Sequence, residues 1–109
     1  MTDKILVLST AGSEAEADKI ARALVERRLA ACVNILPKIS SVYWWQGKIE
    51  KSEEWLLVIK TKQEFFAVVR DTIKELHSYE LPECISIQMD DGSADYLRWI
   101  EESVTAAQR

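Results

Sequence analysis

The chain has 109 residues, of which 48% are hydrophobic and 29% are charged, and this composition predicts a single folded domain over residues 1–109. The formal net charge is −4 and there is no Lys/Arg cluster beyond Arg27-Arg28, which argues against a nucleic-acid partner. The apolar run near the amino terminus, residues 5–8, is too short for a signal peptide or a membrane span, so we expect a cytoplasmic protein with no membrane partner.

The two cysteines support this expectation. Cys32 and Cys84 are far apart in the sequence and form no CxxC motif. This pattern, without a secretion signal, is typical of buried and reduced thiols in a cytosolic protein. We expect Cys32 to be a core residue rather than a metal ligand.

The first strand and the first helix are clearly indicated. Residues 5–8 form a continuous apolar run, which is typical of a strand covered on both faces. Ser13 and Glu16 have capping-box spacing, so the Ser13 oxygen is expected to accept from the backbone N–H of Glu16. The helix that follows carries one apolar stripe, formed by Ala17, Ile20, Ala21, Leu24 and Val25.

The middle of the chain predicts a long, bent β-hairpin. Residues 30–36 and residues 39–45 both have the composition of a strand. Pro37 lies between them and marks an edge or a bulge, because proline cannot donate to the ladder of a sheet.

The turn of this hairpin has two candidate sites. Residues 50–53 form one of them, but a turn there would set the second strand against the next helix. We therefore predict the turn at Gln46-Gly47. In a continuous register this turn pairs Trp45 with Lys48, Val33 with Lys60 and Ile35 with Val58.

Aromatic residues gather at the tip of the hairpin. Tyr43 and Trp45 are predicted to point to one face, and Val42 and Trp44 to the other. A monomer seldom covers both faces of a projecting hairpin. We therefore expect Tyr43, Trp44 and Trp45 to lie in an interface between subunits rather than in a single core.

The second half of the chain predicts a helix, a strand and a further helix. Residues 61–64 are a second capping-box candidate, and residues 84–89 are expected to form the last core strand. The final helix is expected to begin at Ser93 or Asp95. The helix between them is expected to bury Phe65, Phe66, Val69, Ile73 and Leu76.

The predicted order is strand, helix, strand, strand, helix, strand, helix. With right-handed crossovers this string gives an α+β fold, the ferredoxin-like split βαβ sandwich with an extra C-terminal helix. In that topology the second and fourth strands are opposite edges of the sheet. Cys32 and Cys84 are then too far apart to form a disulfide.

Several blocks of the sequence together resemble the CutA divalent-cation-tolerance family. They are LAACVNILP at residues 29–37, SVYWWQGKIE at 41–50, IKT at 59–61, HSYELPE at 77–83 and YLRWI at 96–100. The resemblance extends from residue 5 to about residue 104.

This resemblance implies a homotrimer in which the long hairpins pair across subunits and remove the exposed edges. It also implies a cytosolic protein involved in the response to copper and other divalent metal ions, with weak copper binding. The alternative is a PII-like signalling or scaffold trimer, which the family's trimer resembles. Such a trimer would bind a small anion or metabolite in the clefts between subunits.

The resemblance also directs attention to residues 77–83, which we call the corner. Copper-binding members of the family have a cysteine near the end of the first strand and paired histidines before the tyrosine of the corner. The corresponding residues here are Ser9, Leu76 and His77, so only His77 keeps a metal-binding side chain. His77 is the candidate ligand for copper or another divalent cation. Its alternative role is structural, as a helix C-terminal residue that bonds nearby carbonyls.

The other polar residues of the corner also have two interpretations. Tyr79 and Glu83 either shape the turn and pair with Lys60, or line a cleft with Lys60 and with Tyr43 and Trp45 of a neighbouring hairpin. In the second case Lys60 would be the counter-charge for an anion.

The sequence offers little support for catalysis. No Ser/His/Asp or Cys/His pair has suggestive spacing, and three glycines in total provide no glycine-rich phosphate loop. An acid/base pair of Glu83 with His77 or Tyr79 is the one catalytic arrangement left open. We expect a protein that is not an enzyme.

Overall fold

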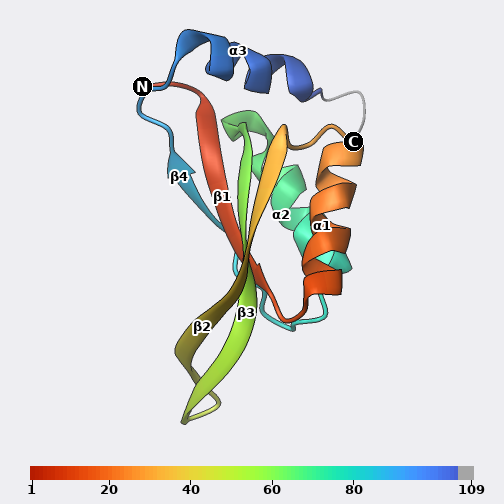
Figure 1. Ribbon diagram of the computed structural model, residues 1–109, viewed down its shortest axis with the longest axis vertical. Coiled ribbons are helices and arrows are strands. Elements are labelled where there is room, and N and C mark those ends of the chain that lie inside the picture. Colours follow the sequence, from red (N-terminus) through yellow and green to blue (C-terminus); the bar gives the residue numbers. More distant parts are fainter. Residues whose placement is uncertain (106–109) are drawn as a thin grey trace.

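A computed structural model describes residues 1–105 of the chain. Within that range, four strands form one antiparallel sheet in the order β2-β3-β1-β4 (Figure 1). The element order is the predicted one, and β2 and β4 lie at opposite edges of the sheet. The strands are β1 (Lys4–Ala11), β2 (Cys32–Trp45), β3 (Lys48–Lys62) and β4 (Ile85–Gln88); the helices are α1 (Glu14–Glu26), the 3₁₀ turn η1 (Gln63–Phe65), α2 (Phe66–Leu76) and α3 (Ala94–Ser103).

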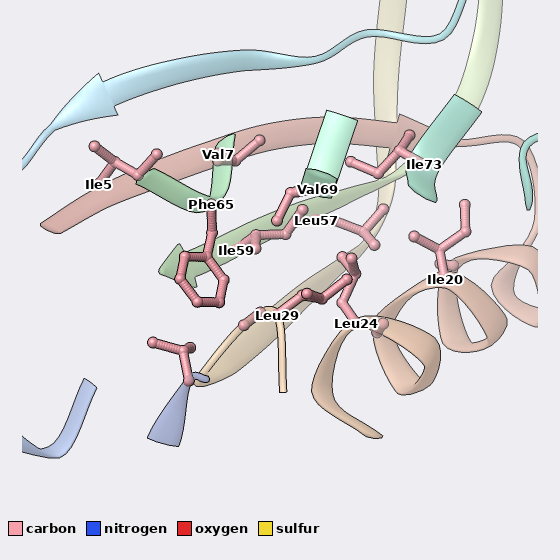
Figure 2. Close-up of a cluster of buried hydrophobic side chains, with 14 of the residues drawn as sticks. Ile5, Val7, Ile20, Leu24, Leu29, Leu57, Ile59, Phe65, Val69 and Ile73 are labelled. Carbon is pink, nitrogen blue, oxygen red and sulfur yellow. The ribbon is translucent and has the colours of Figure 1, made fainter. Parts of the chain in front are cut away.

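The hydrophobic core lies between one face of the sheet and the helices α1 and α2, while α3 lies across the ends of the strands (Figure 1). Each fully buried Leu or Ile side chain contributes about 1.5–3 kcal/mol to stability. No helix in the described part of the chain is long and apolar enough to cross a membrane. Figure 2 shows core residues from both layers: Ile5, Val7, Leu57 and Ile59 from the sheet, Ile20 and Leu24 from α1, and Val69 and Ile73 from α2.

Helix α1 begins as predicted. The Ser13 side chain accepts a hydrogen bond of 3.1 Å from the backbone N–H of Glu16. Four of the five predicted stripe residues are buried, but Val25 is exposed. Val25 lies in the last turn of the helix, where the core contact is carried by Leu24.

The hairpin turn is also confirmed. Gln46 and Gly47 both have positive φ, +50° and +79°, as a type I′ turn requires. Trp45 pairs with Lys48 as expected. From this turn, β2 and β3 project well beyond the two-layer part of the molecule (Figure 1).

The predicted register is wrong by one residue on the far side of Pro37. Val33 pairs with Ile59 and Ile35 with Leu57, instead of with Lys60 and Val58. The cause is a bulge between Leu36 and Ile39, where Lys38 adopts a left-handed conformation with φ of +55°. The bulge adds one residue to β2 and shifts every pair beyond it.

The pairing of β2 with β3 shows which face of the sheet the aromatic side chains of the hairpin share. Leu36 pairs with Leu56 before the bulge, and Ile39 pairs with Glu54 after it. Leu56 and Glu54 are two residues apart and therefore point to the same face. Tyr43, which is four residues beyond Ile39, shares that face, and so does Trp45. It is the face of the sheet turned away from α1 and α2.

The capping box predicted at residues 61–64 is not formed. Strand β3 continues through Lys62, so Thr61 points into the core, where its Oγ1 donates to the carbonyl oxygen of Leu29 at 2.6 Å. Lys62 is the N-cap residue of η1 and provides no side-chain cap.

The second face of the sheet is largely apolar and only partly covered. Leu6 and Leu8 are half-buried, so the prediction that residues 5–8 are covered on both faces is wrong for a single chain. Strand β4 is not a core strand either, because all its residues are exposed at the sheet edge. We call this surface the open face; its apolar residues are Leu6, Leu8, Leu36, Leu56, Val58, Ile85 and Ile87.

Candidate ligand cleft

The corner is organised by His77, the C-cap residue of α2, whose side chain is 0% exposed. Its Nδ1 accepts a hydrogen bond of 3.0 Å from the backbone N–H of Tyr79. The ring proton is therefore assigned to Nε2, which donates to the carbonyl oxygen of Thr10 at 2.6 Å. Nε2 thus holds the corner against β1, and Nδ1 holds the chain within the corner, which agrees with the structural role that the sequence offered as an alternative.

Helix α1 holds the same corner through Glu16. Its carboxylate accepts hydrogen bonds from the backbone N–H and the hydroxyl of Ser78, each at 3.1 Å. Its Oε1 also lies 3.5 Å from Nδ1 of His77. Because Glu16 is in the first turn of α1, the positive end of the helix dipole favours a carboxylate there.

Tyr79 connects the corner to the hairpin. Its hydroxyl donates to Oε2 of Glu54 at 2.9 Å, and its ring centroid lies 4.5 Å from that of His77. Burial raises the pKa of the Tyr79 phenol, and the hydrogen bond to Glu54 raises it further. Tyr79 is therefore a neutral hydrogen-bond donor to a carboxylate.

A cleft of about 720 Å³ lies between the corner and the hairpin. Tyr43, Trp44 and Trp45 of β2 line it on one side, and Tyr79 and Pro82 line it on the other. This volume is in the range of sites for small organic ligands, which are typically aromatic clefts with a few polar groups.

The charged groups that line the cleft are all negative. All the charged residues that line it are acidic: Glu54, Glu80 and Glu83. Glu54 is only 6% exposed. Burial raises the pKa of the Glu83 carboxyl, and the Glu54 carboxylate raises it further. Among residues 1–105, no basic side chain forms an ion pair with any of the three.

The structure brings four of the five predicted cleft residues together. Tyr43, Trp45, Tyr79 and Glu83 line one cleft, and all four come from the same chain. A neighbouring hairpin is therefore not needed to form these walls.

Lys60 is the predicted cleft residue that lies elsewhere. It pairs with Cys32 and Leu6 in the sheet, and its Nζ lies 3.2 Å from the hydroxyl of Tyr96 in α3. Within one chain, Lys60 thus supplies no counter-charge to the cleft and no ion pair to Glu83.

Sequence reasoning missed Glu54 and Gly12. Glu54 was detectable, because the predicted turn at residues 46–47 already places it opposite Ile39 and on the face of Tyr43. Gly12 had no such signal. Its importance is steric, since a Cβ at this position would lie 2.9 Å from the hydroxyl oxygen of Tyr79.

The predicted metal ligand His77 has no companions in the described part of the chain. No group of three or more His, Cys, Asp or Glu side chains is placed to hold a metal ion there. Ser9, at the position of the family's cysteine, is fully buried, and its hydroxyl makes no hydrogen bond to any residue in the range 1–105. Leu76 packs against the core. A metal at His77 would have to displace one of the two hydrogen bonds of the ring.

The two cysteines are free thiols, as predicted, and are half-buried rather than fully buried. Cys32 lies on β2 and Cys84 directly before β4, at opposite edges of the sheet. Burial raises the pKa of the Cys84 thiol, which keeps it in the protonated, unreactive form.

The aromatic residues predicted for an interface are unequally covered. Trp44 is 71% exposed, whereas Tyr43 is 41% exposed. The tip of the hairpin thus leaves apolar surface open in one chain, with the exposed Val42 and Ile49 in addition to Trp44.

The sequence matches the family model described as CutA1 divalent ion tolerance protein over residues 5–103. The chain is 48% identical over 95 residues to the divalent-cation tolerance protein CutA of Archaeoglobus fulgidus, which covers 87% of this chain and 92% of that protein.

Solved structures agree with this match. The crystal structure of CutA from Xylella fastidiosa has a TM-score of 0.93 to this chain at 41% sequence identity, and covers 95% of this chain and 100% of that one. The A. fulgidus structure, described as a periplasmic divalent cation tolerance protein, has a TM-score of 0.91 at 45% identity, and covers 94% of this chain and 99% of that one. The chain therefore belongs to the CutA1 divalent ion tolerance protein family.

Proposed function

We propose that this protein acts as a cytoplasmic homotrimer in the response to divalent metal ions, with weak binding of copper or another divalent cation at the corner. Membership of the family supports the role in metal tolerance. The strand order supports the ferredoxin-like split βαβ class for the subunit. The two free cysteines support a reducing compartment.

The main structural support for the proposed trimer is the open face. It presents apolar side chains from all four strands, and helices α1 and α2 cover only the other face. Contiguous apolar patches of this kind mark interaction surfaces in soluble proteins. Burying the open face against other copies would remove Ile85 and Ile87 from water, and the exposed Trp44 offers a second contact.

The two sheet edges favour a closed ring. The free edge of β2 and the free edge of β4 belong to different strands, so pairing one with the other is a head-to-tail contact. Repeated head-to-tail contacts form a ring when the rotation closes. Closure also covers both edges, which otherwise invite aggregation. The resemblance to the family supports a ring of three subunits.

Light scattering on the purified protein tests the assembly. We expect a mass of three times the chain mass of 12.5 kDa. Ile87→Asp places a charge on the open face and is expected to yield monomers, because the charge would be buried without a partner. Val25→Asp, on an exposed position of α1, is the matched control and stays trimeric. A monomeric wild-type protein would exclude the proposed assembly.

Calorimetric titration with copper tests the metal site. We expect weak binding by the wild type, because a metal at His77 must replace a hydrogen bond to Thr10 or Tyr79. His77→Ala is expected to lose that binding. Equal binding by the two proteins would remove His77 from the metal site and leave carboxylates as the ligands.

A second candidate function is that of a PII-like sensor or scaffold. The cleft between corner and hairpin favours it, since its aromatic walls and convergent polar groups are those of a small-ligand site. In the proposed trimer each subunit would present one such cleft.

A further inference from the structure

The cleft holds negative charge that the described part of the chain does not balance. Glu54 is 6% exposed, and the hydrogen bond that it accepts, from the hydroxyl of Tyr79 at 2.9 Å, comes from a neutral group. Glu83, whose side chain is exposed, lines the same cleft. Buried carboxylates in proteins are normally paired with a cation, because their removal from water is otherwise strongly unfavourable. The missing partner is a positive charge.

The aromatic walls of the cleft also favour a positively charged ligand. Tyr43 and Trp45 lie on the face of the hairpin that borders the cleft, next to Tyr79. The faces of aromatic rings carry negative potential and attract ammonium and guanidinium groups. The rings also provide apolar surface for the body of a ligand.

We propose that this cleft binds a small organic cation, an amine whose ammonium group is held by the Glu54 and Glu83 carboxylates and whose apolar body lies against Tyr43 and Trp45. The proposal rests on the cleft being the ligand site of the second candidate function. It replaces the anion predicted from Lys60 with a ligand of opposite charge, because Lys60 lies against Tyr96 instead of in the cleft.

Other ligand classes fit the cleft less well. A divalent metal ion prefers a shell of several oxygen ligands, and residues 1–105 hold no group of three or more suitable side chains placed for one. The four aromatic residues of the walls, Tyr43, Trp44, Trp45 and Tyr79, do not complete such a shell. An anion would meet only carboxylates among the charged side chains of the lining.

Three matched probes test the sign of the charge: benzylamine as the cation, benzyl alcohol as the neutral analogue and benzoate as the anion. Each is titrated into the ¹⁵N-labelled full chain, and amide shifts are followed by NMR. We expect saturable shifts at residues of the corner and of β2 with benzylamine. Binding of the alcohol should be weaker by about tenfold or more, since a charge-assisted hydrogen bond is lost.

Variants of the carboxylates assign the site. Glu83→Gln and Glu54→Gln keep the size of the side chain and are each expected to weaken benzylamine binding about tenfold. Glu53→Gln is the matched control, because Glu53 is adjacent on β3 but points to the other face of the sheet. It should bind like the wild type. Thermal unfolding of each variant shows whether it is folded.

The outcomes separate this proposal from the others. Equal affinity for the three probes, or tighter binding of benzoate, would overturn it. So would unchanged benzylamine binding in both cleft variants.

A lysine of another subunit is the alternative source of positive charge. In that case benzylamine would not bind the wild type but would bind the Lys60→Met variant, and this result would also overturn the proposal. The trimer mass and the copper titration are separate experiments. A failure of the metal-tolerance proposal would appear in them, whereas a failure of the cation proposal would appear in the benzylamine titration.

Discussion

At the scale of single residues, Tyr79 connects the parts of the candidate site. Its hydroxyl donates to the buried Glu54, its ring lies beside that of His77, and its backbone N–H donates to the same imidazole. Gly12 permits this arrangement, because the phenol occupies the space that a side chain would take. Glycine is required at this position because a residue distant in the sequence packs against it, and no local sequence pattern reveals that requirement.

Gly12→Ala tests the close approach. A Cβ 2.9 Å from the hydroxyl oxygen of Tyr79 must displace the phenol and weaken its hydrogen bond to Glu54. We expect a loss of about 1–3 kcal/mol in the free energy of unfolding. Urea denaturation of the wild type and the variant measures it.

A double-mutant cycle provides the control. In a Tyr79→Phe background the oxygen that meets the new Cβ is absent. Gly12→Ala should therefore be less destabilising there than in the wild type. The same loss in both backgrounds would show that the effect comes from the backbone and not from Tyr79.

At the scale of elements, α3 is attached to the sheet mainly through charges. The Glu101 carboxylate accepts from Lys4 at 2.9 Å and from Lys62 at 2.7 Å, so one side chain connects α3 to β1 and β3. Hydrogen bonds from Lys4 and then Lys62 hold the pKa of the Glu101 carboxyl below its usual value. Ile100 adds a fully buried apolar contact.

This attachment predicts a pH dependence of stability. When the pKa of a carboxyl group is lower in the folded than in the unfolded protein, its ionised form stabilises the fold at pH values above the unfolded pKa. This stabilisation is lost as the pH falls through the pKa of the folded protein. Glu101→Gln should therefore reduce stability at about pH 6 and have a smaller effect at about pH 3. Because the Glu101 side chain is 48% exposed, we expect a difference below about 1 kcal/mol.

Denaturation of both proteins at the two pH values measures this difference. Glu102→Gln is the control, since Glu102 lies on the same helix and forms no ion pair within residues 1–105. An equal effect of Glu101→Gln at both pH values would show that its charge does not stabilise α3.

The bulge in β2 sets the face of the residues that precede it. Leu36 pairs with Leu56 and Ile39 with Glu54, so both lie on one face although they are three residues apart in β2. Without the extra residue, the side chains of β2 before Pro37 would point to the opposite face. Tyr43 and Trp45 share the face of Glu54 through the pairing that follows the Gln46-Gly47 turn.

At the scale of the whole molecule, the chain measures 44 × 26 × 21 Å, and the projecting hairpin accounts for its elongation (Figure 1). Two layers enclose one core, while the open face, the tip of the hairpin and two sheet edges are left for contacts with other molecules. The proposed trimer uses all three kinds of surface.

The trimer also has a thermodynamic signature. If assembly stabilises the folded subunit, the midpoint of thermal unfolding rises with protein concentration. Scans across a hundredfold range of concentration check this expectation. A midpoint that stays constant, with the trimer present at each concentration, would show that the subunit folds independently of its partners.

Much of this molecule was predictable because its signals are local. The Ser13 cap, the Gln46-Gly47 turn and the order of the elements depend on residues adjacent in the chain, and all three are confirmed. The corner was found because Pro82 and His77 end a helix. These patterns reflect short-range sterics and hydrogen bonding, which the sequence contains directly.

The sequence by itself therefore determined the helices, the hairpin turn and the residues worth testing. Only the tertiary structure decided the register beyond Pro37, the place of Lys60 and the union of Glu54 with Tyr79, residues 25 positions apart. These depend on a one-residue bulge and on contacts between distant segments, where a small local shift reverses which face a side chain occupies. Because these contacts place Lys60 outside the cleft, the ligand that we propose is a cation instead of the anion expected from the sequence.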